Sequence, residues 1–295
     1  MNTRESTGNS RLGEIEAAQS QSVKGGGITP GEICFLIGRP RSGTTVFRTM
    51  LNSHPLIFSV GEIFNESNPR SYFHFLQQRQ ANDPNALLPS RALDNFRAYI
   101  RWCRARSLEK RPESRVVVLD VKYDQAHLLC VPWWGITFLP KLFSLIREQQ
   151  WRVIDVHRQN SVGMFVSNQV AIETGIYHSS ALPNGEKQRA RVRIDPDALI
   201  RHVTATVQAY RRVEEFFRGY DKYYKVVYEE MFDRADGGQF SSTLLSGVSA
   251  FFGMDNVFNP VPGLAKILED DPFSYVENAD EIREIVNRNN IRDLS

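Results

Sequence analysis

Residues 32–45 read Glu32-Ile-Cys-Phe-Leu-Ile-Gly38-Arg-Pro-Arg41-Ser-Gly43-Thr-Thr45, an apolar run followed by a turn with two glycines. The apolar run, residues 33–37, is typical of a strand buried inside a parallel sheet. Gly38 and Gly43 permit a tight turn, and residues 46–51 continue as a helix. The N-terminus of such a helix presents unpaired amides and a partial positive charge, and both favour phosphate. The pattern therefore predicts a nucleotide site.

The spacing from Gly38 to Thr45 is that of a nucleoside-triphosphate P-loop with one change. Thr44 stands where a P-loop has the lysine that reaches the β- and γ-phosphates beside a magnesium ion. Arg41 supplies a cation from another place in the loop. A nucleotide kinase or NTPase remains an alternative, with Asp120 and Asp155 as its available metal ligands.

The composition of the 295 residues limits the classes of function. A net charge of +2 is too small to indicate nucleic acid as a partner. The three cysteines are odd in number and far apart, which suggests neither a disulfide framework nor a zinc site and favours the reducing cytoplasm. They are Cys34, Cys103 and Cys130. Residues 1–30 are polar and predict a disordered tail, and we find no signal peptide or transmembrane segment.

The remainder, 31–295, is expected to form a single domain. Strands are predicted near 56–60 and at 115–121, 151–156 and 223–228, and helices at 138–146, 161–177 and 195–217. Residues 65–112 read as a helical insertion. Strands that alternate with helices indicate an α/β, P-loop-like three-layer fold, in which a central parallel sheet is flanked by helices. Ligands of such sheets bind at the carboxyl ends of the strands.

The loop and the residues after it resemble a known family. Pro40-Arg-Ser-Gly-Thr-Thr45, the next helix, His54-Pro55 and Gly61-Glu62 are similar to the 5'-phosphosulfate region of sulfotransferases that use 3'-phosphoadenosine 5'-phosphosulfate (PAPS). Both the bacterial carbohydrate enzymes, including the nodulation-factor enzyme, and the tyrosylprotein sulfotransferases share the likeness. Eukaryotic Golgi members carry a membrane anchor, so its absence here favours a bacterial, cytoplasmic enzyme.

The resemblance implies a set of roles. Ser42, Gly43, Thr44 and Thr45 would bind the 5'-phosphate, and Arg41 would stabilise charge on the departing sulfate. Glu62 would be the general base, as a carboxylate can be if burial raises its pKa towards the working pH; His54 and His157 are weaker candidates. Lys122, after the strand at 115–121, would stabilise the transition state. No metal ion is required.

A second motif lies near 157–167. The resemblance implies that Arg158 and Ser167 hold the 3'-phosphate, although their separation is nine residues where eight is usual, so that Gln159 has the standard spacing. The cations of 189–193 are the next choice. Tyr228, at the end of a strand, would contact the nucleotide.

Together these residues predict a PAPS-dependent sulfotransferase that acts on a glycan or glycolipid hydroxyl. A protein-tyrosine acceptor and a non-catalytic nucleotide-binding module are the other possibilities. The sequence does not indicate an oligomeric state.

Overall fold

The computed structural model describes residues 32–129, 140–177, 190–233, 239–259 and 271–289. Its centre is a parallel sheet with the strand order β2-β3-β1-β4-β5. The strands are β1 (Glu32–Gly38), β2 (Ile57–Glu62), β3 (Val116–Lys122), β4 (Arg152–His157) and β5 (Tyr223–Val227). The predicted α/β class with a central parallel sheet is thereby confirmed.

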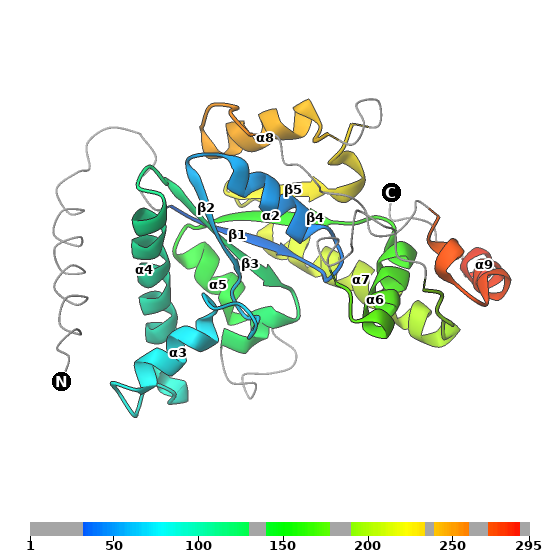
Figure 1. Ribbon diagram of the computed structural model, residues 1–295, viewed down its shortest axis with the longest axis horizontal. Helices are drawn as coiled ribbons and strands as arrows, with labels where there is room; N and C mark the ends of the chain where they lie inside the picture. The colour runs from blue at the N-terminus through cyan, green and yellow to red at the C-terminus, as the bar shows by residue number, and fades with distance from the viewer. Residues whose placement is uncertain (1–31, 130–139, 178–189, 234–238, 260–270, 290–295) are drawn as a thin grey trace.

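Helices cover both faces of the sheet (Figure 1). One face, the α2 face, packs against α2 (Thr44–Ser53) and α8 (Ser242–Phe252). The other, the α7 face, packs against α3 (Tyr72–Gln80), α4 (Ala92–Lys110), α5 (Lys141–Glu148) and α7 (Pro196–Phe217).

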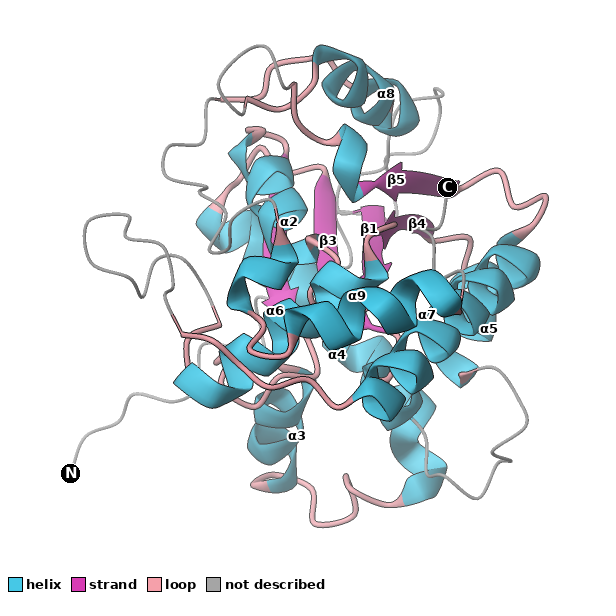
Figure 2. Ribbon diagram, turned by 90° about the vertical axis from the view of Figure 1, so that its right-hand side faces the viewer, coloured by secondary structure: helices cyan, strands magenta, loops and turns pink. Residues whose placement is uncertain are grey.

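Beside α7, a third apolar cluster joins α6 (Ser161–Thr174) to α9 (Ala279–Arg288), and these three helices lie together in Figure 2. Short 3-10 turns complete the described part of the chain. They are Pro89–Arg91, Gln125–Leu129, Tyr228–Glu230 and Pro272–Tyr275.

The helices that connect successive strands switch from one face of the sheet to the other at β1. The helix that follows β1 packs on the α2 face, whereas α5 and α7, which follow β3 and β4, pack on the opposite face. In open parallel sheets the carboxyl ends of the strands at such a change form the crevice in which ligands bind. The loop at 38–43 lies at that crevice because it follows β1 directly.

Two predicted boundaries are wrong by a few residues. The helix expected to reach Tyr177 ends at Thr174, because Gly175 adopts the left-handed conformation (φ 69°) that ends helices. Tyr228 lies outside β5, at the start of the 3-10 turn that follows it. Some predictions concern residues outside the described chain. They are the part of the expected helix at 138–146 that precedes Pro140, Cys130, the tail at 1–30 and the cations before residue 190.

No helix among the described residues is long and apolar enough to cross a membrane.

Candidate functional site

The turn after β1 has the backbone of a phosphate-binding loop. Arg41 and Gly43 both have positive φ, 66° and 96°. Helix α2 starts directly after Gly43, and its first intrahelical bond joins the amide of Phe47 to the carbonyl of Gly43. No described side chain caps this terminus. The amides of Thr44 and Thr45 are therefore free to bind an anion.

Glycine is required at position 43 for two reasons. Its φ lies in the left-handed region, and an added Cβ would lie 2.2 Å from the Tyr228 ring. Tyr228 consequently packs directly on the loop. The ring also stacks with Arg158, whose guanidinium carbon is 4.8 Å from the ring centroid.

The second motif meets the loop through Arg41. Its Nε and Nη2 donate to Ser167 Oγ at 3.0 and 2.9 Å, and Nη1 donates to the carbonyl of Tyr177 at 2.7 Å. Arg158 in turn donates from Nη1 to the carbonyl of Arg41 at 3.1 Å. Burial, and then repulsion by Arg158, lowers the pKa of Arg41. Two guanidinium groups that repel each other in a partly buried place favour an anion between them.

Arg158 is also held from behind, on the α7 face. Its amide donates to the Tyr210 hydroxyl at 3.1 Å, and Tyr210 stacks on His157 with the ring centroids 4.0 Å apart. His157 Nε2 lies 2.9 Å from Asp155, a fully buried carboxylate that also accepts from Tyr223 at 2.7 Å. The adjacent amides of Gln159 and Asn160 donate to Glu229. These contacts fix the end of β4 and the start of α6.

The catalytic candidates lie at the ends of β2 and β3. Lys122 Nζ lies 3.2 Å from Glu62 Oε1, 2.7 Å from Asp120 Oδ1 and 2.6 Å from Thr44 Oγ1. The ammonium thus bridges the loop to the carboxylate that was predicted to be the base. Arg48 completes the cluster, because its Nη1 is 3.3 Å from Asp120 Oδ2.

A β-bulge puts Glu62 in this cluster. The pairing of β2 with β3 shifts between Ser59 and Gly61, so Val60 is an extra residue. Regular alternation would turn Glu62 to the α7 face with Phe58 and Val60. With the extra residue, Glu62 pairs with Asp120 and shares the α2 face with it.

The charges in the cluster set the pKa of Glu62. Burial acts to raise it, but the ammonium of Lys122, with smaller contributions from Arg48 and Asn65, outweighs burial, so the pKa of Glu62 is lowered. The condition expected from the sequence for a base, that burial raise this pKa, is therefore not met, because the sequence could not show the contact with Lys122. Asp120 behaves in the opposite way, since its complete burial raises its pKa in spite of the same two cations.

Asp120 was named only as a metal ligand of the kinase alternative and Arg48 was not predicted at all, yet the sequence carries a signal for both. Asp120 and Lys122 alternate along one strand and so share a face. Arg48 is four residues after Thr44 on α2 and so lies one helical turn beyond it. A charged residue within an apolar strand needs a partner, and this rule could have identified the pair.

Neither histidine replaces Glu62 in the cluster. His54 Nδ1 accepts from the amide of Leu56 at 3.1 Å, and Nε2 lies 3.0 Å from the carbonyl of Asp255, so both nitrogens are engaged by the backbone. His157 lies with Asp155 on the α7 face, across the sheet from Glu62. Both positions agree with structural roles.

Unpaired polar atoms test whether the loop fits a nucleotide. Ser42 Oγ, Arg39 Nε and Arg158 Nε are buried, and none has a hydrogen-bond partner among the described residues. Buried polar atoms normally have partners, and leaving one unpaired costs on the order of 1–3 kcal/mol. All three lie in or beside the turn at 38–43, and two belong to cationic side chains. Together with the free amides of α2, they fit a ligand that carries several phosphate-like groups.

In the described residues, no group of three or more His, Cys, Asp or Glu side chains could hold a metal ion.

No protein-family model matches the chain, and no curated protein matches it. Among solved structures it is similar to a sulfotransferase domain from the curacin biosynthetic pathway, with 17% identity over 82% of this chain and 79% of that one and a TM-score of 0.43. It is also similar to the sulfotransferase domain of the Synechococcus PCC 7002 olefin synthase, with 17% identity over 93% of this chain and 100% of that one and a TM-score of 0.39. A third similar structure is the mouse sulfotransferase SULT7A1 complexed with PAP, with 14% identity over 95% of this chain and 69% of that one and a TM-score of 0.36.

Proposed function

We propose that the protein transfers a sulfuryl group from PAPS to a hydroxyl of a carbohydrate or glycolipid. The observation that carries the proposal is the position of Lys122, whose ammonium contacts both Thr44 of the phosphate-binding loop and Glu62. A donor held on the loop would thus lie next to a cation and a carboxylate. Those are the parts that an in-line transfer to a hydroxyl needs.

The donor would be held at two points. The amides and hydroxyls of residues 42–45 would bind the 5' end, where Ser42 Oγ lacks a partner among the described residues. Arg158 and Ser167 would hold the 3'-phosphate, with Tyr228 packed against the loop between them. Arg41 already contacts Ser167, so it links the two points. Its guanidinium can stabilise the negative charge that develops on the departing group.

Glu62 would remove the proton of the acceptor hydroxyl. Its lowered pKa keeps it ionised at neutral pH, and its exposed fraction of 19% leaves it open to an acceptor. The formal charges of Glu62, Asp120, Lys122 and Arg48 sum to zero. When Glu62 takes up the proton the cluster becomes positive by one unit, while negative charge grows on the transferring group. This preorganised change stabilises the transition state more than the ground state.

The direct test is Glu62→Gln, which keeps the shape of the side chain but cannot accept the proton. We expect turnover to fall about 10²-fold or more, while affinity for 3'-phosphoadenosine 5'-phosphate (PAP) stays the same. The two quantities are measured by label transfer from PAPS and by calorimetry. A variant that keeps more than a third of wild-type turnover would assign the base to another residue.

A second function is favoured by one observation. Lys122 places an ammonium 2.6 Å from Thr44, the position at which a P-loop carries its lysine, so β3 supplies the cation that the loop lacks. Phosphoryl transfer from ATP would use a cation at that place. It would also need a carboxylate for magnesium, and Asp120 is already paired with Lys122 and Arg48. A protein-tyrosine acceptor would use the same donor site.

A further inference from the structure

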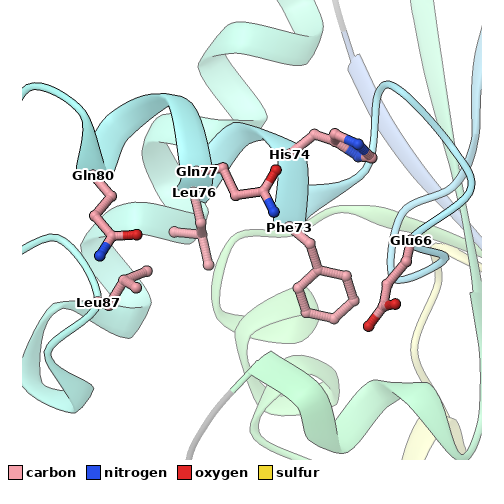
Figure 3. A pocket seen from close by; sticks show the side chains of 7 residues that line it. All are labelled: Glu66, Phe73, His74, Leu76, Gln77, Gln80 and Leu87. Atoms are coloured by element: carbon pink, nitrogen blue, oxygen red, sulfur yellow. The ribbon is translucent and has the colours of Figure 1, made fainter.

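A pocket of about 430 Å³ lies along α3, beside the turn that follows β2. Its volume is within the roughly 300–1,000 Å³ that is usual for small-molecule sites. Figure 3 shows the Phe73 ring beside the carboxylate of Glu66, with Gln80 and Leu87 at the other end. From Phe73 to Gln80 the helix rises by about 10 Å, so the pocket is elongated.

The near end of the pocket is tied to Glu62. Asn65 Nδ2 donates to Glu62 Oε2 at 3.4 Å, and Glu66 is the next residue. Asn68 Nδ2 donates to the carbonyl of Glu62 at 2.8 Å, and the amide of Tyr72 donates to the carbonyl of Ile63 at 2.7 Å. The turn that carries the base therefore also forms a wall of the pocket. The pocket and the carboxylate of Glu62 are thereby joined through the adjacent residues Asn65 and Glu66.

Contacts within the protein hold part of the pocket wall in place. Ser71 caps α3 by accepting from the amide of His74. The Phe73 ring packs on Phe64 with the centroids 6.0 Å apart, and Asn95 holds the carbonyl of Ala86 on the far wall. Where the wall is held in this way, binding a ligand carries no further cost for ordering side chains.

The chemistry of the lining selects the class of ligand. Phe73, Leu76 and Leu87 offer apolar surface, while the amides of Gln77 and Gln80 can each donate and accept hydrogen bonds. No lysine or arginine is among the described residues that line the pocket. Such a surface suits a neutral molecule with apolar faces and many hydroxyls, and the carboxylate of Glu66 would repel an acidic one.

We propose that this pocket binds the acceptor, and that the acceptor is a neutral oligosaccharide whose sulfated hydroxyl reaches Glu62. The inference rests on the proposed sulfuryl transfer and adds to it the residues that recognise the acceptor. The apolar face of a sugar ring packs on Phe73, and the sugar hydroxyls form hydrogen bonds with Gln77 and Gln80. The elongated shape gives room for more than one ring.

The experiment compares Gln77→Ala with Gln78→Ala, since both residues are exposed glutamines on α3 and only Gln77 lines the pocket. Full-length protein receives labelled PAPS with a panel of neutral oligosaccharides of two to five sugars, or with an acidic tyrosine-containing peptide. PAP affinity is measured by calorimetry in parallel. We expect label in an oligosaccharide, and a KM for it that rises about threefold to tenfold in Gln77→Ala and stays unchanged in Gln78→Ala, the scale of one hydrogen bond. PAP affinity should stay the same in both.

Equal KM values for the two variants, or label only in the peptide, would overturn the pocket proposal and leave sulfuryl transfer intact. Failure of the wild-type protein to bind PAP and to label any acceptor would instead overturn the proposed function.

Discussion

Lys122→Met should move the acid limb of the pH–rate profile to higher pH. The ammonium of Lys122 lies 3.2 Å from Glu62 Oε1, and it is the largest influence that lowers the pKa of that carboxyl against burial. Without it, burial dominates and Glu62 takes up a proton more readily. Since only ionised Glu62 can act as a base, activity should then be lost at a higher pH than in the wild type.

The size of the effect follows from the distance. Unit charges separated by 3.2 Å interact by about 5 kcal/mol at an effective dielectric constant of ~20. Water reaches the partly exposed Glu62 and screens part of this energy. If a quarter survives, it equals about 1.4 kcal/mol, or roughly one pH unit. We therefore expect the limb to move by about one unit.

The assay is kcat/KM for PAPS-dependent label transfer between pH 4 and 8. Lys122→Arg is the matched control, because it keeps the charge and should leave the limb near its wild-type position whatever the rate. Rates will fall in both variants, so the position of the limb is the readout. A limb that stays in place in Lys122→Met would refute the electrostatic coupling between Lys122 and the base.

Arg158→Ala should weaken PAP binding about tenfold to a hundredfold but leave adenosine 5'-phosphate binding almost unchanged, because only PAP has a 3'-phosphate; calorimetry with both nucleotides checks this, and equal losses would place the 3' site elsewhere. Tyr210→Phe removes the hydroxyl that accepts from the Arg158 amide, so PAP affinity should fall by a smaller factor, about threefold, in the same calorimetric assay. Burial, with Arg39 second, lowers the pKa of His202 to about 4. The unfolded chain therefore binds a proton that the folded chain does not between about pH 6.5 and pH 4, and stability falls as the pH is lowered through this window. His202→Leu should remove about 1 kcal/mol of that loss after solvent screening is discounted, as measured by urea unfolding at pH 7 and pH 4.5; an unchanged difference would contradict the assigned cause.

The sequence was sufficient where local chemistry determines the backbone. Helix α7 begins at Pro196 after the cap Asp195 and ends at Phe217, as the Asp-Pro pair and the apolar spacing predicted. The loop at 38–43 is determined in the same way by its two glycines and the apolar strand before them. In these places the signal lies within a few residues.

Other features depend on contacts between distant segments. The bulge at Val60 that turns Glu62 towards Lys122 is a property of the pairing between β2 and β3, and Gly61 alone hinted at it. The bond from Arg41 to Ser167 joins residues 126 positions apart. Helices α8 and α9 were not predicted, although both close apolar clusters that begin far upstream. Such features arise from tertiary packing, which periodicity in a single segment does not report.

The central claim is that the loop serves sulfuryl rather than phosphoryl transfer. The most direct measurement incubates the protein either with labelled PAPS and an acceptor extract in excess EDTA, or with ATP and magnesium. We predict transfer of label from PAPS in EDTA and no hydrolysis of ATP, because Arg41 and Lys122 provide the charge that a P-loop enzyme takes from its own lysine and a metal ion. Magnesium-dependent ATP turnover that is abolished by Thr45→Ala, with no transfer from PAPS, would contradict it.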